Sequence, residues 1–286
     1  MKWIFNHEIV EEDQLTIPVK DHGFLYGVGL FETFRVYDGL PFLFKEHIQR
    51  LQAGVELLGI DYSLDEKKLF QELKRLLRVN DLSNAYIRLT VSAGTAPFGM
   101  PTEKYRKPSI LWQIKEMPPL SDSPIMDKKA VLLKTRRNSP ETSYRLKTLN
   151  FLNSIVAKQE IMDKENTEGF FLTSEGYLAE GIVSNLFFVK SKKLYTPDLS
   201  TGILKGITRD KVIQIAGLLN YPVITGYFDP EELLDADEVF ITNSIQEVVP
   251  IVQFEERYFN YNSESLVFQL IREYKRCIKI QLKQKM

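Results

Sequence analysis

The amino-acid sequence predicts an α+β protein with two domains. The chain has 286 residues, which is more than one hydrophobic core usually serves. Short apolar strands alternate along it with amphipathic helices. Residues 117–124 contain three prolines and three serine or aspartate residues, a composition that supports neither a helix nor a central strand. We therefore expect a smaller N-terminal α/β domain over residues 1–116, a linker over 117–127 and a larger C-terminal domain over 128–286.

Turn signals and hydrophobic periodicity predict the elements of the N-terminal part. The dipeptide Asp38-Gly39 is a hairpin turn signal, and it separates an alternating strand at 31–37 from a return strand at 41–44. The other elements expected there are a hairpin at 3–8, helices over 46–58 and 65–77, and strands over 85–93 and 109–115.

The C-terminal part shows the same mixture of short strands and helices. Strands are expected over 130–135, 169–173, 182–189, 193–196 and 238–242, and helices over 149–163, 210–219 and 264–282. Because both parts mix the two kinds of element, each is expected to be α+β.

Composition and charge exclude several classes of function. The formal net charge is −1, so no general field attracts nucleic acid or an acidic membrane. Cys277 is the only cysteine, which rules out an internal disulfide and favours a reducing compartment. The first eight residues lack the apolar stretch of a signal peptide, and no apolar run approaches the ~20 residues of a membrane span. We expect a cytoplasmic protein, although many kinds of protein share these features.

Two segments carry groups that could bind a ligand, and each also has an ordinary structural interpretation. Lys147 precedes a largely apolar helical stretch, where a lysine is normally a surface residue. Gly206 and Thr208 lie where a predicted helix starts. The first amides of a helix have no partners within it, and together with a hydroxyl they can bind phosphate. The same Gly-x-Thr pattern is commonly only a helix cap.

Two further segments carry polar groups next to apolar strands. Ser244 lies in a run of small donors after the strand at 238–242, a place where α/β proteins tend to bind ligands, although a polar turn fits equally well. Glu180 is flanked by small or apolar residues, so it needs a partner or a raised pKa if it is buried. A protonated pyridine nitrogen would be such a partner, and a turn glutamate facing water is the alternative.

Four motifs in chain order resemble the fold-type IV enzymes that depend on pyridoxal 5′-phosphate (PLP). They are Glu46-His47-Ile48-Gln49-Arg50-Leu51, Leu146-Lys147-Thr148-Leu149-Asn150, Glu180-Gly181 with Ser184-Asn185, and Gly206-Ile207-Thr208-Arg209. This class IV aminotransferase-like family contains branched-chain aminotransferases, D-amino acid aminotransferases and 4-amino-4-deoxychorismate lyases. The resemblance extends over nearly the whole chain and implies a two-domain fold with the site at the domain interface.

The resemblance also implies roles for individual residues and no role for a metal. Lys147 matches the lysine that binds the cofactor covalently and moves protons, and Glu180 matches the carboxylate on the pyridine nitrogen. Arg50 matches the arginine on the phosphate. The residues expected to complete the phosphate site are Ile207, Thr208, Ser244 and Ile245. Members of the family are usually homodimers.

Residues on the substrate side favour the lyase branch. Phe31 stands where D-amino acid aminotransferases have tyrosine, and residues 94–99 lack the arginine and histidine that hold the substrate carboxylate there. Thr33 stands where branched-chain enzymes have glycine and resembles the lyases, in which its hydroxyl could assist protonation. The alternative is that Thr33 is an ordinary β-branched strand residue whose side chain faces the hydrophobic core.

The implied activity is conversion of 4-amino-4-deoxychorismate to 4-aminobenzoate and pyruvate, a step of folate biosynthesis. The substrate has two carboxylates, for which four arginines are candidates: Arg35, Arg88, Arg136 and Arg145. An aminotransferase of the same fold and a PLP-binding protein that has lost catalysis are the alternatives.

Overall fold

The computed structural model describes residues 1–121 and 127–284 and contains both helices and strands, which confirms the predicted α+β class. Residues 122–126 of the predicted linker lie outside the described residues. The chain forms two compact units. The first comprises Met1–Leu120, Leu146–Asn150 and Gln281–Met286, and the second comprises Ser121–Arg145 and Phe151–Ile280.

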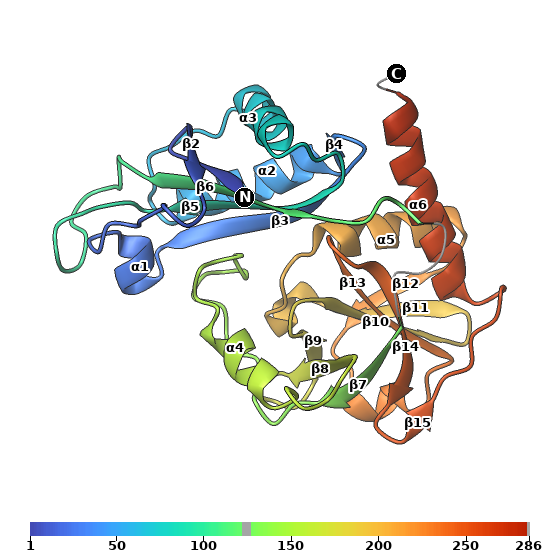
Figure 1. Cartoon of the computed structure of the whole chain (residues 1–286). Coiled ribbons are helices and arrows are strands. Elements are labelled where there is room, and N and C mark those ends of the chain that lie inside the picture. The colour runs from blue at the N-terminus through green and yellow to red at the C-terminus, as the bar shows by residue number, and fades with distance from the viewer. Residues whose placement is uncertain (122–126, 285–286) are drawn as a thin grey trace. The chain divides into compact units, whose positions relative to one another are not determined.

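In the described part of the first unit, six antiparallel strands form one sheet in the order β2-β1-β6-β5-β3-β4. The strands are β1 (Lys2–Phe5), β2 (Glu8–Glu11), β3 (Gly29–Tyr37), β4 (Leu40–Pro41), β5 (Ala85–Ser92) and β6 (Ser109–Glu116). The helices are α1 (His22–Tyr26), α2 (Phe44–Leu57) and α3 (Glu66–Val79). Helices α2 and α3 cover the same face of this sheet (Figure 1).

Alternation along β3 and β5 gives this sheet two different faces. Leu30, Phe34 and Val36 of β3 belong to the core with the buried residues of α2 and α3. Successive side chains of a strand point to opposite faces, so Phe31 and Thr33 lie on the other face. The first unit therefore has one apolar face, packed under helices, and one face that carries polar side chains.

The β3–β4 hairpin turns at Asp38 and Gly39, as the sequence predicts. Both residues have positive φ, 45° and 78°, and positive φ at both central residues is the requirement of a type I′ turn. The return strand β4 ends at Pro41 and α2 begins at Phe44, so the predicted return strand over 41–44 is wrong beyond its first residue. The core-facing aromatic ring of Phe44 is instead part of the first turn of the helix.

In the described part of the second unit, nine strands form one sheet. They are β7 (Lys128–Leu132), β8 (Thr167–Leu172), β9 (Leu178–Gly181), β10 (Asn185–Lys190), β11 (Lys193–Pro197), β12 (Val223–Gly226), β13 (Glu238–Asn243), β14 (Glu247–Phe254) and β15 (Arg257–Tyr258). The helices are α4 (Leu152–Gln159), α5 (Ile207–Leu218) and α6 (Leu266–Lys283), with 3₁₀ turns η1 (Leu199–Thr201) and η2 (Pro230–Leu233). The residues of α6 from Gln281 on belong to the first unit.

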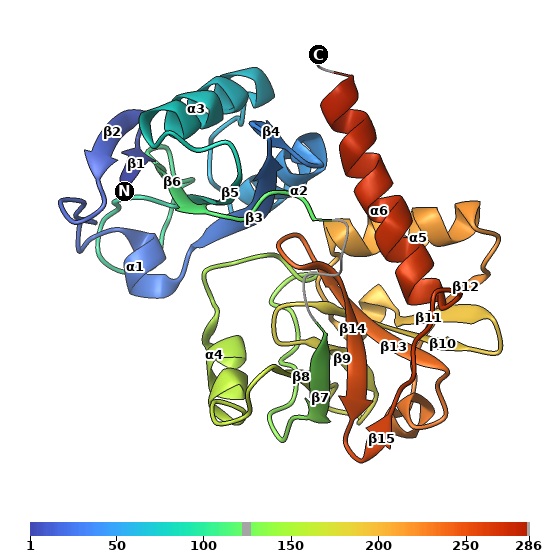
Figure 2. The same cartoon turned by 45° about the vertical axis from the view of Figure 1, so that its right-hand side comes forward.

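Part of this second sheet closes on itself. The strands follow the order β10-β13-β14-β7-β8-β9, and β9 also pairs with β10. The closure brings distant parts of the sequence together: β7 runs parallel to β14, and Figure 2 shows the two strands next to each other. A closed sheet has no open edge among these strands and surrounds a core that includes Phe170, Phe188 and Ile241.

The segment Leu146–Asn150 belongs to the first unit, although the predicted boundaries place it in the C-terminal domain. Its backbone pairs with the start of β3, because Phe31 N–H donates to Lys147 O and Leu149 N–H donates to Gly29 O, both at 3.0 Å. The expected helix from residue 149 therefore starts later, at Leu152. Among the described residues, no helix is both long enough and apolar enough to span a bilayer.

Candidate functional site

Lys147 lies on the polar face of the first unit's sheet. Its Nζ is 4.5 Å from the ring centroid of Phe31, and the Arg88 guanidinium carbon is 3.6 Å from the same centroid. Thr33 is the direct cross-strand partner of Arg88, so its side chain points to the same face. The structure thus brings together a lysine, a hydroxyl and an arginine around one aromatic ring.

The electrostatics of this face suit an anion. Two cationic side chains share the ring of Phe31, whose π-face attracts positive charge. Burial lowers the pKa of Arg88, and hydrogen bonding to Tyr86 acts in the opposite direction. A carboxylate that approached Arg88 would meet a partly desolvated guanidinium, which forms stronger hydrogen bonds than one in water.

Arg50 extends from α2 and forms a bidentate ion pair with Glu32 of β3. Its Nε donates to Glu32 Oε1 and its Nη2 donates to Glu32 Oε2, both at 2.7 Å. His47, one turn earlier on α2, donates from Nδ1 to Glu32 Oε2 at 2.7 Å. Burial by itself would raise the pKa of Glu32, but the Arg50 charge and the hydrogen bonds outweigh it and bring the pKa to about 2. Glu32 is therefore a carboxylate at neutral pH.

Glu180 lies in the second unit at the end of β9, where several donors meet it. Arg137 Nε donates to Oε1 at 2.8 Å, and the Leu204 N–H donates to Oε2 at 3.0 Å. Asn185 Nδ2 lies 3.4 Å from Oε2. Glu180 is buried, and these donors are the partners that a buried carboxylate requires. Its burial excludes the alternative of a turn glutamate that faces water.

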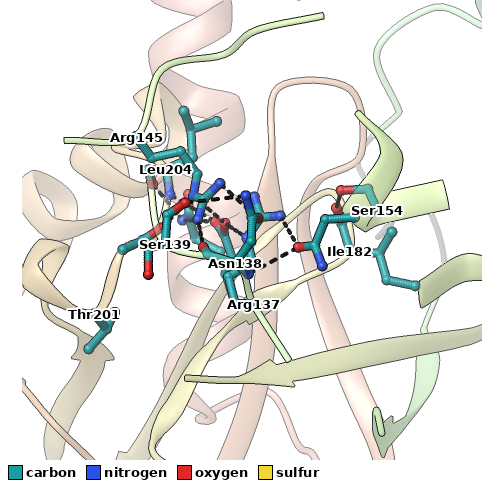
Figure 3. A network of polar contacts seen from close by, with 12 residues as sticks. Arg137, Asn138, Ser139, Arg145, Ser154, Ile182, Thr201 and Leu204 are labelled. Carbon is teal, nitrogen blue, oxygen red and sulfur yellow. Dashed lines mark hydrogen bonds and ion pairs between the residues drawn. The ribbon is translucent and has the colours of Figure 1, made fainter. Parts of the chain in front are cut away.

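Arg137 and Arg145 connect Glu180 to the loops around it. Figure 3 shows both arginines in one network of polar contacts with Asn138. Arg137 Nη1 donates to Asn153 Oδ1 at 2.7 Å. Arg145 donates to the carbonyl oxygens of Gly202 and Asn138. Burial, and next the nearby charge of Arg137, lower the pKa of Arg145 to about 10. The two arginines fix the surroundings of this carboxylate.

The N-terminus of α5 has the features of the anion site that the sequence predicts. Gly206 is its N-cap, no side chain in the described ranges caps the helix, and Ile207 and Thr208 are buried. The first amides of a helix have no partners within it and attract anions. Thr208 Oγ1 lies 3.5 Å from Ser244 Oγ, so two hydroxyls face each other beside this helix start.

Glycine at position 206 allows a close approach of the Asn185 side chain to the backbone. A Cβ at this position would lie 1.9 Å from Asn185 Oδ1. Asn185 in turn donates from Nδ2 to Leu204 O at 2.8 Å, next to the helix start. In this structure the side chain of Asn185 therefore occupies the space of a Cβ at 206, and a larger residue there would require Asn185 to shift.

In the turn after β13, Ser244 and its neighbour Ile245 have different hydrogen-bond partners. The Ile245 N–H donates to Asn243 Oδ1 at 3.0 Å, and the Gln246 N–H donates to the same atom at 2.7 Å. The amide of Ile245 thus already has a partner within its own turn. Of this predicted pair, Ser244 is the residue whose hydroxyl reaches Thr208.

The contacts of the four candidate arginines distinguish them. Arg35 is buried and donates to the carbonyl oxygen of Pro118, and Arg145 belongs to the network around Glu180. Arg136 is exposed. Arg88 is the candidate that shares an aromatic ring with Lys147. In the described ranges, no group of three or more histidine, cysteine, aspartate or glutamate side chains could hold a metal ion.

Residues that the sequence patterns did not single out are also part of these sites. Glu32 and His47 fix Arg50, and Arg137 donates to Glu180. A signal for Glu32 exists in the sequence: it is an acid at a core-facing position of the alternating strand, between Leu30 and Phe34. Nothing in the local pattern distinguishes Arg137 from the neighbouring Arg136.

Comparison with known proteins decides the family. The family model described as amino-transferase class IV matches residues 29–254, which is most of the chain. The chain belongs to this family. The match includes β3, Lys147, Glu180, the start of α5 and the turn with Ser244, so every motif that suggested the resemblance lies within it.

Individual relatives in the class IV family differ in their named activities. An aminodeoxychorismate lyase of Bacillus subtilis (strain 168) is 42% identical over 262 residues, which covers 91% of this chain and 88% of the relative. A protein of Methanocaldococcus jannaschii with the name "Putative branched-chain-amino-acid aminotransferase" is 36% identical over 274 residues, covering 96% and 94%. D-alanine aminotransferases match as well.

Solved structures confirm the fold of the class IV enzymes. The branched-chain aminotransferase of the thermophilic archaeon Thermoproteus uzoniensis, crystallised with norvaline, has a TM-score of 0.87 and 26% sequence identity. The match covers 96% of this chain and 94% of the other. A further branched-chain amino acid aminotransferase, complexed with N-(5'-phosphopyridoxyl)-L-glutamate, has a TM-score of 0.83. The protein therefore has the fold-type IV architecture that the sequence predicted, and its cofactor is PLP.

Proposed function

We propose that this protein is a PLP-dependent lyase that converts 4-amino-4-deoxychorismate to 4-aminobenzoate and pyruvate. The observation that carries the choice of lyase is the 42% identity to the Bacillus subtilis lyase over 91% of the chain. The geometry agrees with it, because Thr33 and Arg88 lie on the same sheet face as Lys147. The reaction needs a proton donor and a carboxylate-binding group near the amine that reacts with the cofactor.

The described residues fit a phosphorylated pyridine aldehyde. Lys147 and Arg50 from the first unit would bind its aldehyde carbon and its phosphate. From the second unit, Glu180 would hold the ring nitrogen, and the α5 amides of Ile207 and Thr208 would bind the phosphate with Ser244. The buried start of α5 supports this assignment, because such a helix end needs an anion or other acceptor. When bound, the cofactor supplies an electron-accepting ring.

The protein's own side chains would then move the protons. The Lys147 amine takes the proton from the substrate carbon that carries the nitrogen. Thr33 holds or relays a proton toward the enolpyruvyl methylene, and the carbon–oxygen bond breaks as pyruvate leaves. Arg88 binds a substrate carboxylate, and Glu180 keeps a proton on the pyridine nitrogen by accepting its hydrogen bond.

Incubation of the purified protein with 4-amino-4-deoxychorismate tests the lyase activity. We expect equal amounts of pyruvate and 4-aminobenzoate, and Thr33→Val should reduce both because the hydroxyl is lost while the shape is kept. A protein that releases no pyruvate but transfers an amino group from leucine or D-alanine to 2-oxoglutarate would be an aminotransferase, which the 36% identical relative favours. A protein that binds PLP and is inert to all these amines would have lost catalysis.

We also propose that the protein is a cytoplasmic homodimer. One side of α4 and the residue before it exposes large apolar side chains: Phe151, Leu152, Ile155 and Val156. Leu152, Ile155 and Val156 follow the i, i+3, i+4 spacing of one helix face. A contiguous apolar face of this kind is typical of a surface that a second copy covers.

A further inference from the structure

We propose that Glu32, assisted by His47, is the positioning residue that aims the Arg50 guanidinium at the cofactor phosphate. This inference rests on the proposed function, in which Arg50 binds that phosphate. It concerns the first unit alone, where all three residues lie. Glu32 does not itself contact the cofactor in this scheme, and it acts through Arg50.

The ion pair fixes the direction of the guanidinium. Glu32 accepts from Nε and Nη2, so the carboxylate takes one complete edge of the planar group. The other N–H groups of the guanidinium, two on Nη1 and the second on Nη2, point away from this carboxylate. A bidentate contact allows little rotation about the side-chain bonds, and therefore these N–H groups have fixed directions.

Burial makes Glu32 a rigid support. The Glu32 side chain is 1% exposed and the Arg50 side chain is 19% exposed, so the arginine leads from the core toward the surface. His47 is also buried, and burial lowers its pKa more than the bond to Glu32 raises it, so the ring is neutral at pH 7. A neutral ring with its proton on Nδ1 holds Glu32 Oε2 without adding charge.

Two opposite effects on phosphate affinity follow from this arrangement. The negative charge of Glu32 offsets that of Arg50 and weakens the attraction of any anion. The fixed geometry reduces the side-chain entropy that Arg50 loses on binding. If positioning is the larger effect, removal of the Glu32 charge weakens cofactor binding; if charge compensation is larger, removal strengthens it. Our proposal is that positioning is the larger effect.

The matched control is Glu72, a second buried carboxylate in the same unit. It also lies against a histidine, His7, and accepts from Trp112 Nε1 at 3.0 Å. Because its contacts are with these residues, Glu72→Gln removes a comparable buried charge without a change at the phosphate arginine. A purely structural role of Glu32 would give the two variants the same behaviour.

The experiment measures the affinity of the full-length protein for PLP and for pyridoxal, which lacks the phosphate. We expect Glu32→Gln to weaken PLP binding about tenfold or more and to leave pyridoxal binding unchanged, whereas Glu72→Gln changes neither. His47→Ala keeps both charges of the ion pair and should also weaken PLP alone. In an Arg50→Gln background, Glu32→Gln should have no additional effect, since both act through one group.

Each contrary result has one meaning. If Glu32→Gln binds PLP as tightly as the unaltered protein or more tightly, or loses PLP and pyridoxal affinity equally, the positioning role is overturned. If Arg50→Gln itself leaves PLP affinity unchanged, the phosphate assignment in the proposed function fails, and the positioning role fails with it. Should Glu32→Gln not fold, Glu32→Asp is the second variant, because it keeps the charge but places the carboxylate one methylene farther from Arg50. The same selective loss of PLP affinity is expected for it.

Discussion

A single acid on an otherwise apolar strand face shows how residue chemistry sets this structure. Leu30 and Phe34 of β3 are core residues, and Glu32 lies between them on the same face. A charge placed there is unfavourable unless it is paired and hydrogen-bonded. Arg50 and His47 supply these partners from α2, so the placement of the helix on the sheet and the geometry of the arginine depend on each other.

The pH dependence of stability should report the Glu32 ion pair. The pKa of Glu32 falls from 4.5 to about 2 on folding. A lowered carboxyl pKa contributes stability that is fully present above 4.5 and is lost as the pH falls toward 2, on the order of 3 kcal/mol. Urea unfolding at several pH values should therefore show a difference between the unaltered protein and Glu32→Gln that shrinks across this window. A difference that stays constant down to the acid end would contradict the assignment.

Lys147 allows a direct spectroscopic prediction. Lys147→Ala should abolish the absorbance of covalently bound cofactor, because the proposed function assigns the bond with the aldehyde to this amine. Lys134→Ala, which changes an exposed lysine of the second unit, is the control and should leave the spectrum unaltered. An unchanged spectrum of Lys147→Ala would assign the covalent bond to a different lysine.

At the scale of elements, the sequence identified most helices and strands because their periodicity agrees with their burial. The helix expected over 65–77 is α3, and the strands expected over 85–93 and 109–115 are β5 and β6. For other elements, the local sequence gives no support to the helix or strand that the structure shows. Strand β14 contains Pro250, which pairs with Phe240, and a proline argues against a strand interior. Helix α1 has five residues, too few for a helical period to be visible.

Two glycines with open space around them should respond in opposite ways to alanine. Gly39 has a φ of 78° and no described atom within 4 Å of an added Cβ, so Gly39→Ala should cost about 1 kcal/mol through backbone strain alone. Gly217 lies in α5 with ordinary helical backbone and equal space, so Gly217→Ala should stabilise the protein by about 0.5–1 kcal/mol. Thermal unfolding of both variants checks the pair, and a gain at Gly39 would contradict the turn assignment.

The sequence points to candidate site residues where one residue carries the chemistry, and it is less informative where partners are distant in the chain. Resemblance singles out Lys147 and Glu180, and a helix start singles out Thr208. The meeting of Thr208 with Ser244 depends on how α5 packs against β13, and the two residues are 36 positions apart. The same holds for Arg137, which reaches Glu180 across 43 positions, and no local pattern encodes such a contact.

At the scale of the whole molecule, the apolar face of α4 predicts the oligomeric state. Ile155→Lys places a charge within the proposed dimer surface and should shift the molar mass measured by light scattering toward that of a monomer. Leu218→Lys is the control, since Leu218 on α5 is 83% exposed and outside that face, and its mass should not change. Equal masses for the unaltered protein and Ile155→Lys would exclude this face as the interface.

The segment Leu146–Asn150 also has a consequence for how the polypeptide matures. The first unit takes in residues 1–120, this short segment and the last residues of the chain, and Gln281 Nε2 donates to Pro41 O at 2.8 Å. During synthesis, the N-terminal sheet is therefore completed only by residues that are made after all of its own strands. A fragment that stops at residue 120 would leave the amide of Phe31 and the carbonyl of Gly29 without their native partners, and we expect it to aggregate rather than behave as a miniature independent domain.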